Sequence, residues 1–279
     1  KRIEDLVKKI RDRSYQPHPA RRQYIPKKSG NGLRPLGIPS ADDKLVQEAV
    51  RIILESIYEP NFKQTSHGFR PNRSCHTALA QIQRTFTGVS WFVEGDIKGC
   101  FDNIDHHILI GILKRRIKDE AFIDLIWKLL RAGYLEDWMK HQTYSGTPQG
   151  SGVSPLLANI YMNELDQFME EYRGSFNKGD KRRFSNAYVN ANHHYARAKA
   201  RNAKKWELMN EEERENARIM QKELQTTLLS TPRRDQMDPN YRRIVYVRYA
   251  DDFLIGVIGS KTDAEQVKTD VGDFLRQNL

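Results

Sequence analysis

Apolar positions along the chain recur with two spacings, and each spacing predicts one kind of element. Helical spacing predicts helices over 1–14, 42–59, 74–86, 103–117, 120–133, 155–172, 204–229 and 262–278. Short apolar, β-branched runs predict strands at 90–97, two within 22–38 around a turn signal at 29–32, and two within 242–259 around a tight turn at Ala250-Asp251. With 279 residues, the chain is long enough for a substantial apolar core.

The pattern weakens over residues 173–240, which are polar, charged and poor in aliphatic residues. Only the 204–229 helix carries an apolar stripe there. Charge follows the same division: the net charge of +10 separates into +9 over 1–90, −5 over 91–172 and +6 over 173–240, while the last 39 residues balance. Basic segments on both sides of an acidic one are typical of a polyanion-binding protein with a separate carboxylate-rich site. Ordinary solvated basic surfaces remain the alternative.

Composition excludes some classes of protein. The sequence has no apolar run of transmembrane length and no signal peptide. Its two cysteines form neither a disulfide framework nor a metal-binding spacing, which favours a reducing compartment. The chain starts without Met and ends just after a predicted helix, so we expect a piece of a longer protein.

The segment VRYADDFLIG places Asp251 and Asp252 side by side at the tip of a predicted hairpin. Two such charges repel by about 1 kcal/mol in water and about 4 kcal/mol at an effective dielectric of about 20. A divalent cation would compensate, and Mg²⁺ binds one or two carboxylates together with substrate phosphates. A third carboxylate, Asp96, ends the apolar strand at 90–97. The alternative for the Asp pair alone is a type I′ turn, in which Asp is common.

Asp102 and Asp105 follow Asp96 closely in the sequence. Both fall at the start of a predicted helix, where an acidic side chain caps free backbone N–H groups and complements the helix dipole. Capping is the favoured interpretation of these two residues.

Four longer motifs extend the pattern: RPLGIPSADDKLVQEAV, SHGFRPNRSCHTAL, WFVEGDIKGCFDNIDH and GTPQGSGVSPLLANIYMNELD. Together with YADD, they resemble the group II intron reverse transcriptases, also called maturases. The resemblance covers about 15–172 and 241–279, in the order of the family.

The resemblance implies an α+β fold, the fingers and palm of a right-hand polymerase, with helices packed on one face of an antiparallel palm sheet. Residues 1–90 would form basic fingers, and 91–172 the palm with the first catalytic Asp and the TPQG loop. Residues 173–240 would be a basic, partly helical insertion, and 241–279 would add the YADD hairpin and a helix. The thumb of the family is absent, so we expect this piece alone to polymerise weakly or not at all.

By resemblance, Asp96, Asp251 and Asp252 match the family's catalytic, metal-binding aspartates. The backbone carbonyl of Ile97 would add a ligand for two Mg²⁺ ions. Such ions would activate a primer 3′-hydroxyl and stabilise the leaving pyrophosphate.

A role at the nucleotide site is implied for seven further positions. Phe101 matches the aromatic residue under the deoxyribose that excludes a 2′-hydroxyl, and a core Phe is its alternative. Gln149 would contact the incoming nucleotide, while Gly150 and Gly152 would let the backbone approach closely. This loop reads Gly-Ser-Gly, where the family usually has Gly-Gly. Three basic residues would hold the triphosphate, or else lie in a solvated loop: Arg21, Lys27 and Arg34.

The insertion mixes Arg and Lys with Tyr, His and Trp, a combination that RNA-binding segments use for phosphate contact and stacking. The candidate RNA-binding residues are Arg182, Arg183, Arg197, Lys199, Arg201, Lys204 and Lys205. A solvated helical appendage is the alternative.

The resemblance therefore implies RNA-directed DNA synthesis together with binding of intron RNA that assists splicing and retrohoming. The implied partners are intron RNA, an RNA template with a DNA primer, and deoxynucleoside triphosphates, with no membrane and with a homodimer left open. The setting would be a bacterial cytoplasm or an organelle. The alternatives are a non-catalytic RNA scaffold and a related cellular or defence-associated reverse transcriptase.

Overall fold

The computed structural model of the chain describes residues 2–26, 32–136, 139–143, 145–147 and 150–279. Its helices are α1 (Arg2–Arg11), α2 (Ala41–Tyr58), α3 (Cys75–Thr85), α4 (Cys100–Asn103), α5 (His106–Arg116), α6 (Glu120–Leu130), α7 (Ser154–Phe176), α8 (Asn186–Lys205), α9 (Glu211–Ser230) and α10 (Lys261–Asn278). Its strands are β1 (Ala20–Pro26), β2 (Leu33–Ile38), β3 (Trp91–Asp96), β4 (Tyr134–Glu136), β5 (Met139–His141), β6 (Arg243–Tyr249) and β7 (Asp252–Ile258).

Most of the predicted elements are confirmed, including the hairpin at 242–259. Ser40 caps α2, because its side chain accepts from the Asp43 N–H. Three predictions were wrong or incomplete. The helix predicted at 103–117 is α5, which begins only at His106, and the short helix α4 before it was not predicted. The short strands β4 and β5 were not predicted. Helix α8 was missed because its inward side is made largely of Ala, Asn and Tyr and therefore gives no aliphatic periodicity.

Two sheets organise the chain. The palm sheet is antiparallel with the order β3-β7-β6, and its register places Asp96 directly opposite Asp252. The fingers sheet has the order β2-β1-β4-β5, in which β1 and β4 run parallel and the other pairs antiparallel. The α+β fold with an antiparallel palm sheet is confirmed.

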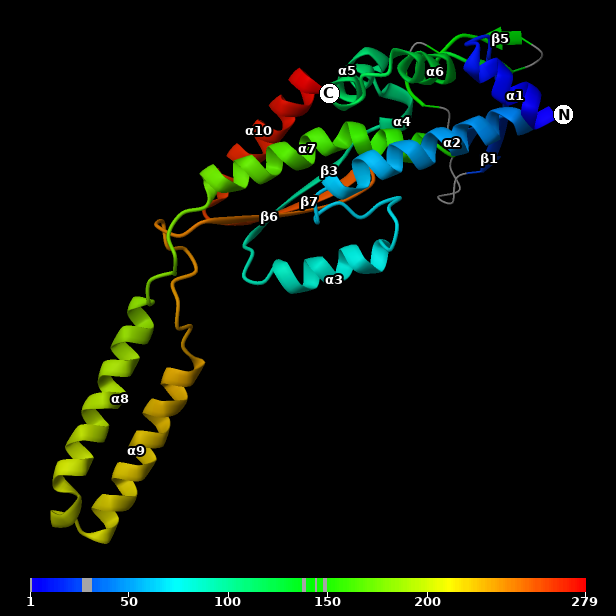
Figure 1. The fold of residues 1–279 in the computed structure, drawn as a ribbon. Coiled ribbons are helices and arrows are strands. Elements are labelled where there is room, and N and C mark those ends of the chain that lie inside the picture. The colour runs from blue at the N-terminus through cyan, green and yellow to red at the C-terminus, as the bar shows by residue number, and fades with distance from the viewer. Residues whose placement is uncertain (1, 27–31, 137–138, 144, 148–149) are drawn as a thin grey trace.

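Helices cover both faces of the palm sheet (Figure 1), which corrects the expectation of a single covered face. On one face, α7 and α10 contribute to the main core with Ile244, Ile255 and Val257. On the other face, α3 packs through Ala78 on Val247. Because side chains alternate along a strand, Asp96 and Asp252 point to the α3 face.

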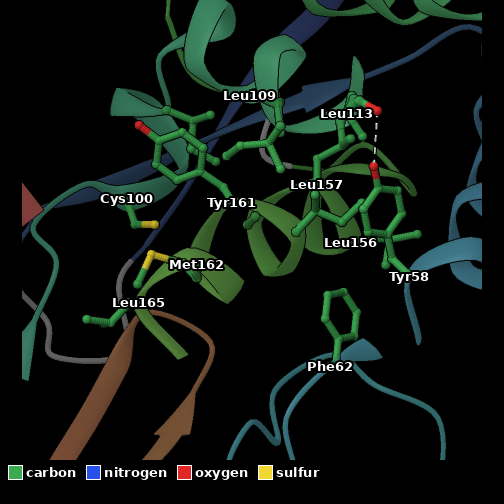
Figure 2. Packing of buried hydrophobic residues seen from close by; sticks show 14 of the residues in the cluster. Tyr58, Phe62, Cys100, Leu109, Leu113, Leu156, Leu157, Tyr161, Met162 and Leu165 are labelled. Atoms are coloured by element: carbon green, nitrogen blue, oxygen red, sulfur yellow. Dashed lines mark hydrogen bonds between the residues drawn. The ribbon is translucent and has the colours of Figure 1, made fainter. Parts of the chain in front are cut away.

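Helix α7 lies at the centre of the main core. Figure 2 shows its Leu156, Leu157 and Met162 packing between α5 and the end of α2. Cys100, at the start of α4, lies beside Met162 and connects this core to the end of β3. Of the residues described, Cys75 and Cys100 are both free of disulfides.

Helix α2 buries a different stripe from the apolar residues that its sequence suggests. Val46, Val50 and Leu54 face the core, whereas Ile52 and Ile53 remain about half exposed. The helix is apolar around much of its circumference, so periodicity alone does not select the buried side. Within the described ranges, no helix combines the length and hydrophobicity needed to cross a membrane.

Helices α8 and α9 form a long hairpin that projects away from the palm (Figure 1). At its base, the two chain segments are joined by isolated antiparallel β-bridges of the backbone, one between Lys178 and Arg242 and one between Phe184 and Arg234. Only Ala198 and Asn202 are buried in the two helices, and neither belongs to the main core. The hairpin is therefore an appendage, which we call the α8–α9 arm.

Candidate active site

The turn between β6 and β7 carries the adjacent aspartates. Tyr249 pairs with Asp252, which leaves Ala250 and Asp251 as a two-residue loop. Of the two, only Ala250 has a positive φ, 57°. That sign pattern is found in type II′ turns and differs from the type I′ alternative. A non-glycine residue in this region is strained, so neighbouring structure must hold the turn.

Two contacts hold Ala250 in place. Arg248 Nη1 donates to the Ala250 carbonyl at 2.7 Å. From the other side, the SHGF segment presses against the turn, because a Cβ built on Gly68 would meet the Ala250 nitrogen at 2.3 Å. Only glycine allows this approach. The same segment pairs with the strand through the His67 N–H, which donates to the Arg248 carbonyl at 2.9 Å.

Arg248 is fully buried and paired with Asp166 of α7. Its Nε donates to Asp166 Oδ1 at 2.8 Å and its Nη2 to Oδ2 at 2.6 Å, and both side chains have 0% exposure. Asn159 Oδ1 and Ser66 Oγ accept the remaining guanidinium bonds, and the Tyr246 hydroxyl donates to Asp166 Oδ1. Such a charge is tolerated inside a core only when its donors are satisfied.

Several acidic side chains lie near one another at the turn that this buried network supports. Burial raises the pKa of Asp252 above its ordinary value, and the charges of Asp251, Asp96 and Glu94 reinforce the shift. Burial, with the charges of Asp251 and Asp96, also raises the pKa of the Cys100 thiol to about 11. The sheet thus brings the three predicted aspartates together, with Glu94 two residues before Asp96 on the same face.

The described residues contain no group of three or more His, Cys, Asp or Glu side chains close enough to hold a metal ion. The donors nevertheless suit Mg²⁺, since they are carboxylate oxygens that repel one another. The Ile97 carbonyl, predicted as a ligand, accepts the Cys100 N–H at 3.0 Å and so begins the turn into α4. This bond leaves the carbonyl's second lone pair.

Phe101 is half-buried in α4, beside the aspartates. Its carbonyl accepts the Thr147 N–H at 2.6 Å, which ties α4 to the segment leading into the TPQG loop. His106 also braces this segment, because its Nε2 lies 2.6 Å from the Gly146 carbonyl. The favoured interpretation of Asp105 is confirmed: it caps α5 by accepting from the His107 and Ile108 N–H groups.

The glycines of the loop differ in their surroundings. Gly150 has a φ of 108°, and a Cβ there would lie 2.7 Å from the Gly37 carbonyl of β2. Gly150 therefore allows the palm loop to meet the fingers sheet. Gly152 has open space around it, so the predicted close approach does not occur there. Gln149 lies outside the described residues.

Two of the three predicted triphosphate residues lie in the fingers sheet. Arg21 is exposed in β1 and pairs with Ile38, and Arg34 belongs to β2 opposite Ile25. Lys27 lies outside the described residues. The neighbouring Arg22, which was not singled out, lies 3.6 Å from the centroid of the Tyr134 ring.

The predicted RNA-binding residues fall into two groups. Arg182 donates to the Gly88 carbonyl, and Arg183 forms an ion pair with Asp235 at 2.7 Å, so both serve the base of the arm. The other five are exposed on α8: Arg197, Lys199, Arg201, Lys204 and Lys205. In the described part of the chain, none of these five has an ion pair.

The buried network was missed by sequence analysis, although a signal existed. Arg248 is a charged residue between Val247 and Tyr249, in the part of β6 that is otherwise apolar, and Asp166 is the acid among the buried positions of α7, which are mostly apolar. Each suggests a buried partner. Their separation of 82 positions gives no indication that they pair with each other.

Known proteins are similar in sequence to this chain over the segments that form the two sheets and the candidate site. A family model described as "Reverse transcriptase (RNA-dependent DNA polymerase)" matches residues 25–189. The group II intron-encoded protein LtrA of Lactococcus lactis subsp. cremoris is 48% identical over 100% of this chain and 45% of its own length. The putative COX1/OXI3 intron 1 protein of Saccharomyces cerevisiae is 42% identical over 92% of this chain and 29% of its own.

Nuclear intron maturase 2, mitochondrial, of Arabidopsis thaliana is 28% identical over 84% of this chain and 34% of its own. The chain thus spans less than half the length of these relatives.

The ion pair gives a first prediction. Asp166→Asn leaves the Arg248 guanidinium buried without its counter-charge, so we expect a loss of about 3–5 kcal/mol in the free energy of unfolding. Arg115→Met breaks an exposed pair with Glu164 and should cost about 0–1 kcal/mol. Urea denaturation measures both. Equal small losses would show that the buried pair has no special structural role.

Asp252 gives a prediction of opposite sign. Because its pKa is raised in the folded state, ionisation costs stability as pH rises above the ordinary value of 3.8. Removing this repulsion by Asp252→Asn should raise the melting temperature at pH 7 by about 1–3 °C, and the gain should vanish below about pH 4. Asp105→Ala, which removes a helix cap, should lower it. A lower melting temperature for Asp252→Asn at pH 7 would contradict this account.

Proposed function

Because the chain belongs to the reverse transcriptase family, and within it to the group II intron-encoded proteins, we propose that its parent protein copies RNA into DNA. The observation that carries the proposal is the cross-strand pair Asp96 and Asp252, with Asp251 on the adjoining turn. Purely structural turns have no need of three repelling carboxylates, which cost stability without a cation.

Asp96, Asp251 and Asp252 would hold Mg²⁺, with the Ile97 carbonyl as a further oxygen donor. When bound, Mg²⁺ supplies charge neutralisation and activation of a primer 3′-hydroxyl. The raised pKa of Asp252 supports this assignment, because burial and, after it, the charges of Asp251, Asp96 and Glu94 disfavour its ionised form, and a bound cation would offset both effects. The chain's own contribution is to hold the carboxylates rigidly, through Arg248 and the strained Ala250 turn.

The incoming nucleotide would lie between the palm and the fingers. Phe101 lies near Asp251 and is proposed to test the sugar of this nucleotide for a 2′-hydroxyl. Gly150 lets the TPQG loop meet β2, the strand of Arg34. Arg21, Lys27, Arg34 and Gln149 are proposed to contact the triphosphate and base of this nucleotide.

Primer extension by the full-length parent protein, on an RNA template with Mg²⁺, tests the polymerase. We expect Asp251→Asn/Asp252→Asn to reduce extension by roughly 10³-fold or more, because several kcal/mol of charge stabilisation would be lost. Asp105→Asn is the matched control, since Asn also caps helices, and it should retain activity. Extension that survives the double substitution would refute the assignment of the site.

We further propose that the α8–α9 arm binds RNA, in keeping with the assistance to splicing that the names of the maturase relatives indicate. The supporting observation is the asymmetry of the arm. Helix α8 carries five Lys or Arg and no acid, whereas α9 carries five Glu and three Lys or Arg. One side of the arm is therefore positive and free to meet phosphates. The relatives, bacterial and mitochondrial, suggest a cytoplasmic or organellar setting.

Salt dependence of RNA binding tests the arm. Replacing its five exposed basic residues on α8 with Gln, in the full-length protein, should reduce the magnitude of the slope of log K against log salt by about 3.5–4.5, since each phosphate contact contributes about 0.7–0.9. Arg182→Gln/Arg183→Gln is the control, because both side chains are engaged at the base. An unchanged slope in the five-residue variant would make the arm a spacer.

A further inference from the structure

Phe69, in the SHGF motif, is an aromatic residue in an unfavourable place. Its side chain is 55% exposed, and its φ is 53°, in the left-handed region that bulky residues avoid. Because more than half of the residue is exposed, the burial of its ring does little to offset the backbone strain. Strained residues persist where the surrounding structure imposes them, and they gather at functional sites.

The residues on both sides of Phe69 are fixed. Gly68 lies against the Ala250 backbone, and its carbonyl accepts from Asn159 Nδ2 at 2.7 Å. Arg70 is buried, donates to both carboxylate oxygens of Glu59, and also donates to the Lys63 and Ser66 carbonyls. The left-handed conformation of Phe69 is thus imposed by two anchors rather than by its own packing.

The ring of Phe69 meets the ring of Phe101. Their centroids are 6.1 Å apart and their planes lie at 83°, an edge-to-face arrangement that is favourable between aromatic rings. Both rings line one small cavity with Cys100, Ala250 and Asp251. The same loop that presses on the catalytic turn through Gly68 therefore also contacts the proposed sugar-sensing residue through Phe69.

We infer that Phe69 is a positioning residue for Phe101 and so sets how strictly the enzyme prefers deoxyribonucleotides over ribonucleotides. This inference rests on the proposed polymerase function. One part of Phe101 packs against the main core, and the rest of this half-buried ring can change its side-chain rotamer unless a further neighbour limits it. The edge-to-face contact with Phe69 supplies that limit, and the strained backbone of Phe69 holds its ring against Phe101.

Single-nucleotide incorporation by the full-length parent protein tests this inference through the ratio of kcat/KM for a deoxynucleotide to that for its ribonucleotide. Phe69→Asn removes the ring but tolerates the left-handed backbone. We expect it to lower the ratio at least tenfold, mainly through better use of the ribonucleotide, without lowering the melting temperature. Phe69→Tyr should keep the ratio within twofold, and Phe101→Ala should lower it as a positive control.

Phe92→Asn is the matched control. Phe92 is another exposed Phe that contacts an aromatic ring, that of Phe86, but it lies in β3 four residues before Asp96. Its replacement should leave the ratio unchanged.

An unchanged ratio in Phe69→Asn, while Phe101→Ala lowers it, would overturn the inference. Equal loss with both nucleotides would also overturn it, since Phe69 would then serve another step, such as binding of the duplex. A wild-type protein that incorporates neither nucleotide would overturn the proposed function itself, and the inference with it.

Discussion

The buried ion pair between Arg248 and Asp166 is the interaction on which the geometry of the candidate active site depends. It joins the strand before the aspartates to the central helix α7, and its spare donors reach Ser66 and the Ala250 carbonyl. A guanidinium with 0% exposure cannot hydrogen-bond to solvent in place of its protein partners, so these partners fix its position closely. Three segments distant in sequence are thereby held at one point.

This anchoring stabilises two energetically unfavourable features of the site. Asp96, Asp251 and Asp252 repel one another, and Ala250 is strained. Neither feature would persist in an isolated hairpin, which would relax or open. The core behind the turn, with α7 at its centre (Figure 2), supplies the stability that keeps the turn and its carboxylates in place despite this repulsion.

The α8–α9 arm differs from the palm in how its helices pack. Helices α8 and α9 contribute nothing to the main core, and the inward contacts of α8, unlike those of α9, involve mainly small and polar side chains. Such a segment leaves weak periodicity in the sequence, which explains why α9 was predicted and α8 was not. Its basic character was still readable, because charge composition does not depend on how the helices pack.

The sequence by itself determined most elements, because these depend on local periodicity and turn chemistry, and the order of its motifs predicted the fold class and the candidate aspartates Asp96, Asp251 and Asp252. It also placed Asp105 as a helix cap, an interaction between neighbours in the chain. Only the tertiary structure decided which residues hold the site. The partnership of Arg248 with Asp166, the contact of Gly68 with Ala250 and that of Phe69 with Phe101 join distant segments, and they follow from how sheets and helices pack.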